Sequence, residues 1–558
     1  MAALMRALGV RGLASVLLVL VVALAALSAL LGAPIYGSLL GHDADFAIMS
    51  IHLLGDGWAH GTLWPRWLMG ANHGLGGATY YTYPPLSHWV AAAVTRGLGV
   101  AEDVGVPLTM GLWRLLAVLT TWLWLRRHVP PAAALVGAAI AALLPYASLI
   151  NPWIRFAFAE TAAASLLPLL LLALERAAEG RRTEGLPALA CIYAALAMTN
   201  LPTCALAAHL GPLYALGYAG WRGFGRSVLG GILGALLAAA FLVPAFGLLR
   251  ETNPADFHNP WWKENMLGYS APSPYLLVIW GSGLLMVGLG LGLLRPALGG
   301  TPRAGLLAPG LPRALLVLFA ASTWLATVLA YPVWVAMPQL AATEHPWRAL
   351  GHLVPVVAAL FALATARRPD RWWVVPLGLA LTLMVPAFLF ARMHLGNPGW
   401  VHFVPFGERL TVAEHHYRGS SWEHLPKAAA AAGWATIHGG GAEPYARPVP
   451  PEGTERLTDG FLVHRAAAPF RLPQFYFPAW RAHDAMGPVP LRATPEGWIE
   501  VAVDRPVTDL VVEIGITPQE RIGYAISLLT LMGLLGVLVQ RVRWRPQEAP
   551  APLRSAKG

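Results

Sequence analysis

The sequence has few charged residues for its length. Of its 558 residues, 12% are charged and 56% are hydrophobic. A soluble protein carries about 25% charged residues, so a set of soluble domains is excluded. The high hydrophobic content also excludes a disordered chain. With a mean hydropathy of +0.54, the composition predicts a mainly helical, polytopic membrane protein.

Cysteine and lysine are almost absent. Cys191 and Cys204 lie in apolar stretches, and two such residues cannot form a disulfide framework or a zinc knuckle. There is no Asn-x-Ser/Thr sequon, which favours a bacterial source. Lysine occurs at positions 263, 427 and 557 alone, so arginine provides most of the net charge of +10. The arginines lie in short groups between apolar runs, as membrane orientation requires, and we therefore expect no nucleic-acid partner.

Apolar runs of about 20 residues can cross a bilayer. We expect about twelve, at 13–32, 107–125, 131–149, 158–175, 186–200, 203–219, 227–249, 274–294, 314–333, 348–366, 372–391 and 521–540. Arginine groups fall in every second loop, which predicts cytoplasmic termini. Residues 86–99 are also apolar, but counting them as a span would place the arginines outside. We therefore expect a surface or re-entrant helix there.

This topology divides the chain into three parts. Residues 1–391 form a transmembrane domain with a large first outer loop at 33–106, residues 392–520 form an extracytoplasmic domain, and residues 521–558 hold the last span and a cytoplasmic tail. Short β-branched segments within 470–517 predict a small antiparallel sheet or sandwich. Two roles stay open for it: acceptor binding or covering of the site, and a structural cap.

A helical period begins at Asp45 in the first outer loop. Its apolar stripe is Ile48, Ile51, Leu54 and Trp58, and its polar face holds Asp45, His52 and Asp56. This pattern predicts an amphipathic helix along the outer membrane interface. Asp43 precedes the helix, so it is either an N-cap or a catalytic carboxylate.

Polar groups recur where other spans meet the same side of the membrane. They are Arg114, Asn151, Arg155, Glu160, Asn200, Glu344, His345 and Arg348. Arg114 lies about two turns inside a span, where a charge is costly and usually functional. Together with Asp43, these residues predict a site for an anionic, lipid-linked substrate.

Several short motifs resemble a known family. They are Gly41-His42-Asp43, Gly61 with Pro65-Arg66-Trp67, Gly74-x-Gly76, Tyr83-Pro84-Pro85-Leu86, Arg155 to Glu160, Pro346-Trp347-Arg348, and Phe475 to Trp480. The first outer loop looks like that of the GT-C class of membrane glycosyltransferases. The whole set is similar to the multi-pass bacterial membrane proteins catalogued as "6-pyruvoyl-tetrahydropterin synthase-related", and the resemblance covers most of the chain.

The resemblance implies a GT-C-like fold in the bacterial cytoplasmic membrane. It implies transfer of a sugar, with inversion, from a polyprenyl-phosphate donor to a glycan, lipid or protein acceptor of the cell envelope. Asp43 would be the catalytic base. The expected substrate-binding residues are Asp45, His52, Arg66, Tyr83, Arg114, Arg155, Glu160, Glu344, His345 and Arg348.

Two questions stay open from the sequence. No cofactor is required by these motifs, but Asp43 and Asp45 are the kind of oxygen ligands that a divalent cation such as Mg²⁺ or Mn²⁺ takes. The alternatives to an enzyme are a transporter or flippase of lipid-linked glycans, and a non-catalytic envelope assembly protein with the same fold.

Overall fold

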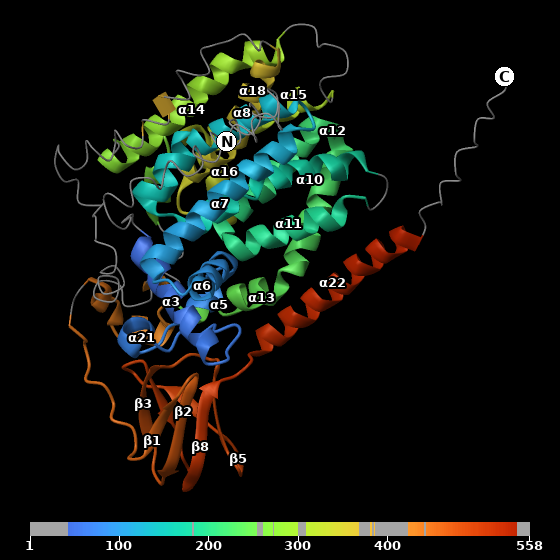
Figure 1. Ribbon diagram of the computed structural model, residues 1–558. Coiled ribbons are helices and arrows are strands. Elements are labelled where there is room, and N and C mark those ends of the chain that lie inside the picture. Colours follow the sequence, from blue (N-terminus) through green and yellow to red (C-terminus); the bar gives the residue numbers. More distant parts are fainter. Residues whose placement is uncertain are drawn as a thin grey trace, which may run out of the picture.

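The structure is a computed structural model that describes residues 43–180, 184–253, 260–271, 273–299, 309–367, 380–381, 384, 422–439 and 442–543. The expected span 13–32 and most of 372–391 lie outside these residues. A bundle of long helices forms one part of the molecule, and antiparallel strands lie at one end of it (Figure 1).

Six helical segments among the described residues are long and apolar enough to cross a bilayer. They are Glu102–Leu125 (α7), Pro131–Arg155 (α8, Pro131–Leu143, with a π-helix, Tyr146–Arg155), Phe158–Glu179 (α9, Phe158–Ala164, with α10, Leu167–Glu179), Leu276–Leu298 (in α14, Pro274–Leu298), Pro346–Arg367 (a 3₁₀ turn, Pro346–His352, with α18, Leu353–Arg367) and Pro518–Gln540 (in α22, Pro518–Arg543). A seventh results if α12 (Leu201–Leu237) and α13 (Ala239–Gly247), which are bent by 76°, form one span. The chain is a multi-pass membrane protein.

The described residues do not show the twelve spans that the sequence predicts. Two expected spans are shorter helices, α11 (Leu186–Thr199) with 14 residues and α15 (Leu311–Leu325) with 15, where a crossing needs about 20. The expected spans 203–219 and 227–249 lie in α12 and α13. Within α12, Ala219 and Gly220 have non-helical backbone angles, so two helices meet there at a kink.

Proline sets the start of several helices. Pro168, Pro187, Pro202, Pro274 and Pro312 each occupy the first turn of α10, α11, α12, α14 or α15. Proline fits there because its fixed φ suits a helix and the missing N–H would have no partner in that turn. At α12, Asn200 also caps the helix, since its Oδ1 accepts from the Thr203 N–H at 2.9 Å.

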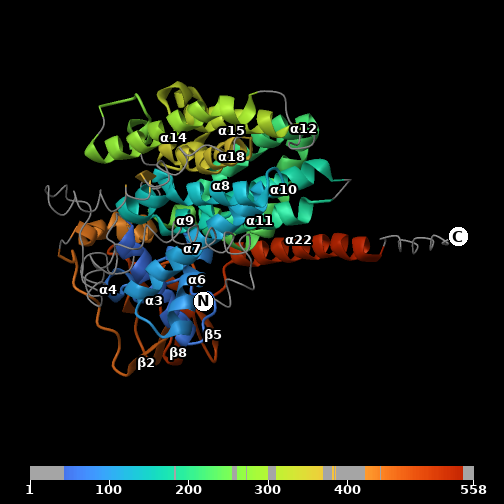
Figure 2. The ribbon, with the colours of Figure 1, turned by 45° about the horizontal axis from the view of Figure 1, so that its top comes forward.

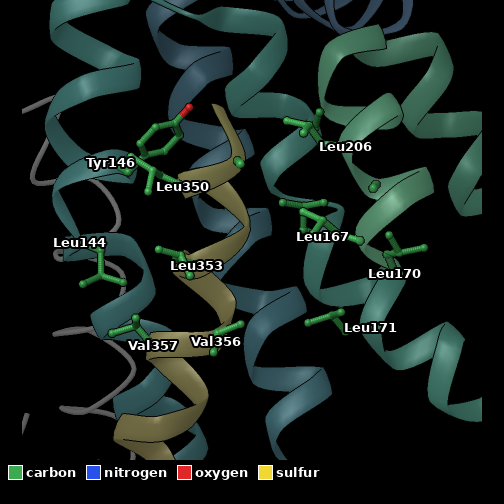
Figure 3. Packing of buried hydrophobic residues seen from close by; sticks show 14 of the residues in the cluster. Leu144, Tyr146, Leu167, Leu170, Leu171, Leu206, Leu350, Leu353, Val356 and Val357 are labelled. Atoms are coloured by element: carbon green, nitrogen blue, oxygen red, sulfur yellow. The ribbon is translucent and has the colours of Figure 1, made fainter. Parts of the chain in front are cut away.

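The bundle core is formed by aliphatic side chains of α8, α10, α12 and α18. Leu144, Leu170, Leu353 and Val357 are each at most 4% exposed, and they pack in successive layers (Figure 3). Tyr146 lies at one edge of these layers, and its hydroxyl points away from Leu144 and Val357 (Figure 3). This edge is where the polar groups begin.

Short helices connect the bundle to the strands. They are α3 (Ala44–Ala59), α4 (Ala71–Gly74), α5 (Thr79–Thr82) and α6 (Leu86–Leu98). The sequence predicts that α3 is amphipathic, but residues 44–51 are all buried, and even Asp45 is only 8% exposed. The first two turns of α3 are buried because they pack against α6 and α7 inside the protein. Helix α6 has only 13 residues, too few to cross a membrane.

The C-terminal part contains two antiparallel sheets. The larger has the order β1 (Thr454–Leu457), β2 (Gly460–Ala466), β8 (Val507–Ile514), β4 (Trp480–Asp484) and β5 (Gly487–Val489); the smaller has the order β3 (Phe470–Phe475), β7 (Trp498–Val501) and β6 (Leu491–Ala493). The expected antiparallel β region is therefore confirmed, and it begins earlier than residue 470. Short helices at Trp422–His424, Lys427–Ala431 (α21) and Trp434–Gly439 precede it.

The strands and the first loop share one hydrophobic core. Trp67 packs against Phe477 and Trp480, with ring centroids 5.7 and 5.8 Å apart. The Trp67 indole N–H donates to Gln474 Oε1 at 3.0 Å. Gly76, at φ +87°, lies so close to Trp67 and Gln474 that a side chain would not fit. The β region is thus attached firmly to the same end of the bundle as α3 to α6. Helix α22 extends away from the rest (Figure 2).

Candidate functional site

A cavity of about 500 Å³ opens where the helical bundle meets the first loop. Its lining comes from the start of α3, the turn after α5, the turns between α8 and α9 and between α11 and α12, the turn before α18, and residues 423–424. The polar and ionisable residues of the lining are Asp43, Thr82, Tyr83, Arg155, Glu160, Asn200, Glu344, Arg348, Glu423 and His424. Turns that the sequence assigns to one side of the membrane therefore meet at one place.

The backbone around the cavity is unusual at three points. Tyr146–Arg155 is a π-helix, a form found often at functional sites. Phe156 and Glu344 have φ values of +52° and +65°, which cost energy for residues other than glycine and which occur often in ligand sites. The π-helix and the turn at Phe156 direct the Arg155 side chain toward Glu160 on the next helix.

Glu160 holds the two arginines of the cavity. Arg155 Nη1 donates to Glu160 Oε2 at 2.5 Å, and Arg348 Nε lies 3.4 Å from the same oxygen. The other oxygen, Oε1, accepts from the Tyr146 hydroxyl at 2.5 Å. Arg155 also lies over the Trp347 ring, 4.6 Å from its centroid. We call Arg155, Glu160 and Arg348 the arginine clamp; it fixes two guanidinium groups at the cavity wall.

Asp43 lies beside the arginine clamp at the entrance to α3. Its backbone N–H donates to the Arg155 carbonyl at 2.9 Å. Asp43 occupies the N-cap position, but its side chain makes no capping hydrogen bond within the described part of the chain. The residue is exposed and lines the cavity. Asp43 therefore lines the cavity without capping the helix.

Three rings form a second wall of the cavity. Phe46 stacks on His424 with centroids 5.7 Å apart, and Tyr83 meets Phe46 edge-on at 5.0 Å. We call Phe46, Tyr83 and His424 the aromatic wall. His424 is held in place because Thr82 Oγ1 lies 2.8 Å from its Nδ1. Burial raises the pKa of Tyr83, so its phenol stays protonated at neutral pH.

Carboxylates outnumber guanidinium groups in the lining. Asp43, Glu160, Glu344 and Glu423 face two arginines. Burial raises the pKa of Glu344, and the nearby charge of Arg348 opposes this shift. The cavity is consequently cationic only at the arginine clamp and acidic elsewhere.

The structure brings six of the predicted site residues together and leaves five outside the lining. Those inside are Asp43, Tyr83, Arg155, Glu160, Glu344 and Arg348; those outside are Asp45, His52, Arg66, Arg114 and His345. His52 lies 2.9 Å from Glu102 and 3.3 Å from Asp56. Asp45 is buried within α3, and His345 stacks on Trp347 at 4.8 Å.

Arg66 and Arg114 contact parts of the fold away from this lining. Arg66 Nε lies 3.0 Å from Glu520 on α22, and its Nη2 donates to the Ala240 carbonyl at 2.8 Å. Arg114 donates to the carbonyls of Ala142 and Ala147. These carbonyls lie where α8 gives way to the π-helix, a place where a membrane helix needs substitute hydrogen-bond donors.

Sequence reasoning missed the contributions of Phe46, Glu423 and His424. Phe46 lies one residue after Asp45 and belongs to a helix that the sequence predicts to be interfacial. Glu423 and His424 come from a short 3₁₀ helix before the β region, more than 300 residues along the chain from Tyr83. No local pattern marks such a long-range contact, although an acid and an imidazole beside Trp422 were a usable signal.

The described residues contain no group of three His, Cys, Asp or Glu side chains that could hold a metal ion. Asp43 lines the cavity, whereas Asp45 is buried in α3. The two carboxylates that the sequence suggests as cation ligands therefore have different surroundings.

No protein-family model and no curated protein matches the chain. Among solved structures, the chain is similar to the arabinofuranosyltransferase AftD from Mycobacteria. A mutant form of AftD aligns with a TM-score of 0.43 and 19% identity over 66% of this chain and 28% of that chain. Another AftD structure gives a TM-score of 0.39 and 17% identity over 67% of this chain and 26% of that one. The chain thus spans less than a third of the length of AftD.

Proposed function

We propose that the chain is an inverting membrane glycosyltransferase of the bacterial cytoplasmic membrane. It transfers a sugar from a polyprenyl-phosphate donor to an acceptor of the cell envelope, and the cavity faces the outside of the cell. The observation that carries this proposal is that Asp43 and the arginine clamp line one cavity of about 500 Å³. The resemblance of the first-loop motifs to GT-C enzymes supports the same reaction.

The arginine clamp provides the donor end of the reaction. Arginine binds phosphate well because its planar group donates several hydrogen bonds and keeps its charge. Arg155 and Arg348 would hold the lipid phosphate and stabilise the charge that it gains as it leaves. Glu160 is a positioning residue, because it touches both guanidinium groups and fixes them relative to each other.

Asp43 provides the base. The acceptor hydroxyl attacks the anomeric carbon, a new C–O bond forms, and the bond to the phosphate oxygen breaks with its electron pair. The proton passes from the hydroxyl to the Asp43 carboxylate. The Asp43 N–H donates to the Arg155 carbonyl, and Phe46 lies three residues further along α3, so Asp43 lines the same cavity as the arginine clamp and the aromatic wall. Donor and acceptor would meet beside it.

The test is Asp43→Asn in the full-length protein, purified in detergent or nanodiscs. A panel of sugar phosphopolyprenols is supplied, and products are followed by lipid and glycan mass spectrometry. A positioned base contributes about 10²–10⁴ in rate, so we expect transfer to fall by at least about 100-fold with unchanged thermal stability. Asp56→Asn, at a half-buried site on α3 outside the cavity lining, is the control. Full transfer by Asp43→Asn would exclude Asp43 as the base.

A further inference from the structure

The aromatic wall is rigid as well as apolar. His88 stacks on Tyr83 from behind, with ring centroids 5.0 Å apart. The Tyr80 hydroxyl donates its only proton to the Ser50 carbonyl at 3.0 Å. The bond of 2.9 Å between Tyr80 and His88 Nδ1 must therefore be donated by the imidazole. This series of hydrogen bonds fixes the tautomer and orientation of His88. Through stacking, His88 in turn fixes the position of Tyr83.

The ring that stacks behind the wall is uncharged. Burial lowers the pKa of His88 to about 3, so its ring is neutral at physiological pH. Phe46 and Tyr83 are uncharged in the same range. On this side of the cavity, the lining also holds the carboxyl groups of Asp43 and Glu423.

The C-terminal segment completes this side. Phe46 and Tyr83 come from the first loop, whereas Glu423 and His424 come from the segment before the β region. The His424 carbonyl accepts from the Ala78 N–H at 3.3 Å, in addition to the contact between its ring and Thr82. The two segments are held in register, so His424 and Glu423 present fixed groups to a ligand.

These features select a particular chemistry. Flat rings accept the C–H face of a sugar ring, and carboxyl oxygens accept hydrogen bonds from hydroxyl groups. A glycan with carboxylates of its own would bind less well beside Asp43 and Glu423, since nearby like charges disfavour binding. A lipid phosphate belongs instead at the arginine clamp, where two guanidinium groups lie.

We propose that the aromatic wall and Glu423 form the acceptor subsite, that it takes a neutral, hydroxyl-rich glycan, and that Glu423 and His424 determine its specificity. That the bound glycan is the acceptor rests on the proposed function. Binding of the glycan itself does not depend on turnover. It narrows the acceptor from glycan, lipid or protein to an uncharged carbohydrate.

The first experiment measures binding to the full-length protein in nanodiscs without donor. Neutral tetrasaccharides of glucose, mannose and arabinose are compared with a tetrasaccharide of galacturonate by isothermal titration calorimetry. We expect at least one neutral probe to bind and the galacturonate probe to bind at least tenfold more weakly. Glu423→Gln and His424→Leu should weaken the neutral probe about tenfold, while Glu452→Gln and His483→Gln, at exposed sites of the β region, should change it less than twofold.

The second experiment measures donor use. With sugar phosphopolyprenol, the enzyme can transfer to the glycan or to water. The Glu423 and His424 variants should raise KM for the glycan about tenfold and leave release of free sugar within about twofold of wild type. Equal loss of both reactions would overturn the assignment, because the residues would then act on the donor.

Other outcomes separate the two proposals. Binding of none of the neutral probes, equal binding of galacturonate, or a variant that binds like wild type would each overturn the acceptor subsite. Glycan binding that depends on Glu423, without use of any donor by the wild type, would support the carbohydrate site and contradict the transferase. A folding failure is detected beforehand by the thermal unfolding of each variant.

Discussion

Two buried carboxylates, Glu160 and Glu175, lie toward opposite ends of the segment Phe158–Glu179 and serve different purposes. Glu175 is fully buried and accepts from the Trp124 indole at 2.8 Å and the Tyr214 hydroxyl at 2.7 Å, with His128 Nε2 at 3.0 Å. Glu160 is 6% exposed and has a comparable number of partners.

The difference lies in where the partners face. Around Glu175 three of the partners, Trp124, His128 and Tyr214, are buried inside the bundle, and the partly exposed Arg127 Nε lies 3.5 Å from Oε2. Around Glu160 two guanidinium groups line a cavity that Asp43 also lines. Burial and ion pairing therefore do not identify a functional carboxylate by themselves. The discriminating feature is shared open space beside the pair.

Of the variants that test this comparison, the one that breaks the arginine clamp is expected to have the largest effect. In Glu160→Gln, Arg155 and Arg348 lose their common anion and shift from their positions. A displacement of about 1 Å costs about 100-fold in rate, and we expect a loss of that order in glycosyl transfer. Glu175→Gln is the matched control and should stay within about twofold per folded molecule. Equal losses of transfer in the two variants would show that Glu160 and Glu175 do not differ in function.

The reverse experiment concerns stability. Glu175→Ala leaves three polar side chains buried without their acceptor, so we expect the free energy of unfolding to fall by about 3 kcal/mol. Tryptophan fluorescence during denaturation in detergent measures this change. If the protein is as stable with alanine as with glutamate, the network at Glu175 is not structural.

A smaller effect separates charge from geometry at the clamp. Arg348→Lys keeps the positive charge but loses the planar group. We expect KM for the sugar phosphopolyprenol to rise about fivefold, with little change in kcat. Steady-state kinetics with varied donor tests this, and Arg367→Lys, at the far end of α18, serves as the control. A KM equal to that of wild type would show that Arg348 acts as a simple charge.

The smallest expected effect is a pH dependence outside the clamp. The hydrogen bond to Glu102, with the charge of Asp56, raises the pKa of His52. A raised pKa in the folded state adds stability that is complete below the unfolded value of about 6.5 and is lost as pH rises through the folded value. Partly exposed ion pairs contribute about 0.5 kcal/mol, so unfolding midpoints should fall slightly between pH 6 and 8. His52→Gln should remove this slope, and an unchanged slope would assign it to another group.

The sequence predicts which end of the bundle carries the site because loop positions follow from the apolar runs. Arg155, Glu160 and Arg348 lie in turns at the same end, and so they can meet. The exact set cannot be predicted from spacing, since Arg66 and Arg114 are also arginines that the sequence assigns to the same side of the membrane. Their partners, Glu520 and the carbonyls at the break after α8, depend on tertiary packing that has no local pattern.

The expected interfacial helix illustrates the same limit. An apolar stripe beginning at Ile48 fits a helix on a membrane surface as well as a helix packed against other helices inside the protein. The neighbours decide, and here α6 and α7 enclose the first turns of α3. The strands of the β region are easier to predict, because alternation in residues such as Leu510 and Val512 is local.

The ion pair between Arg66 and Glu520 bears on how this protein can be shortened. Both side chains are at most 5% exposed, and they join the first loop to the helix at the other end of the described chain. Removal of α22 would take away Glu520 and Tyr524, the two residues that Arg66 contacts on that helix. A truncated protein should therefore need Arg66→Leu or a similar change before its first loop can fold as it does in the whole chain.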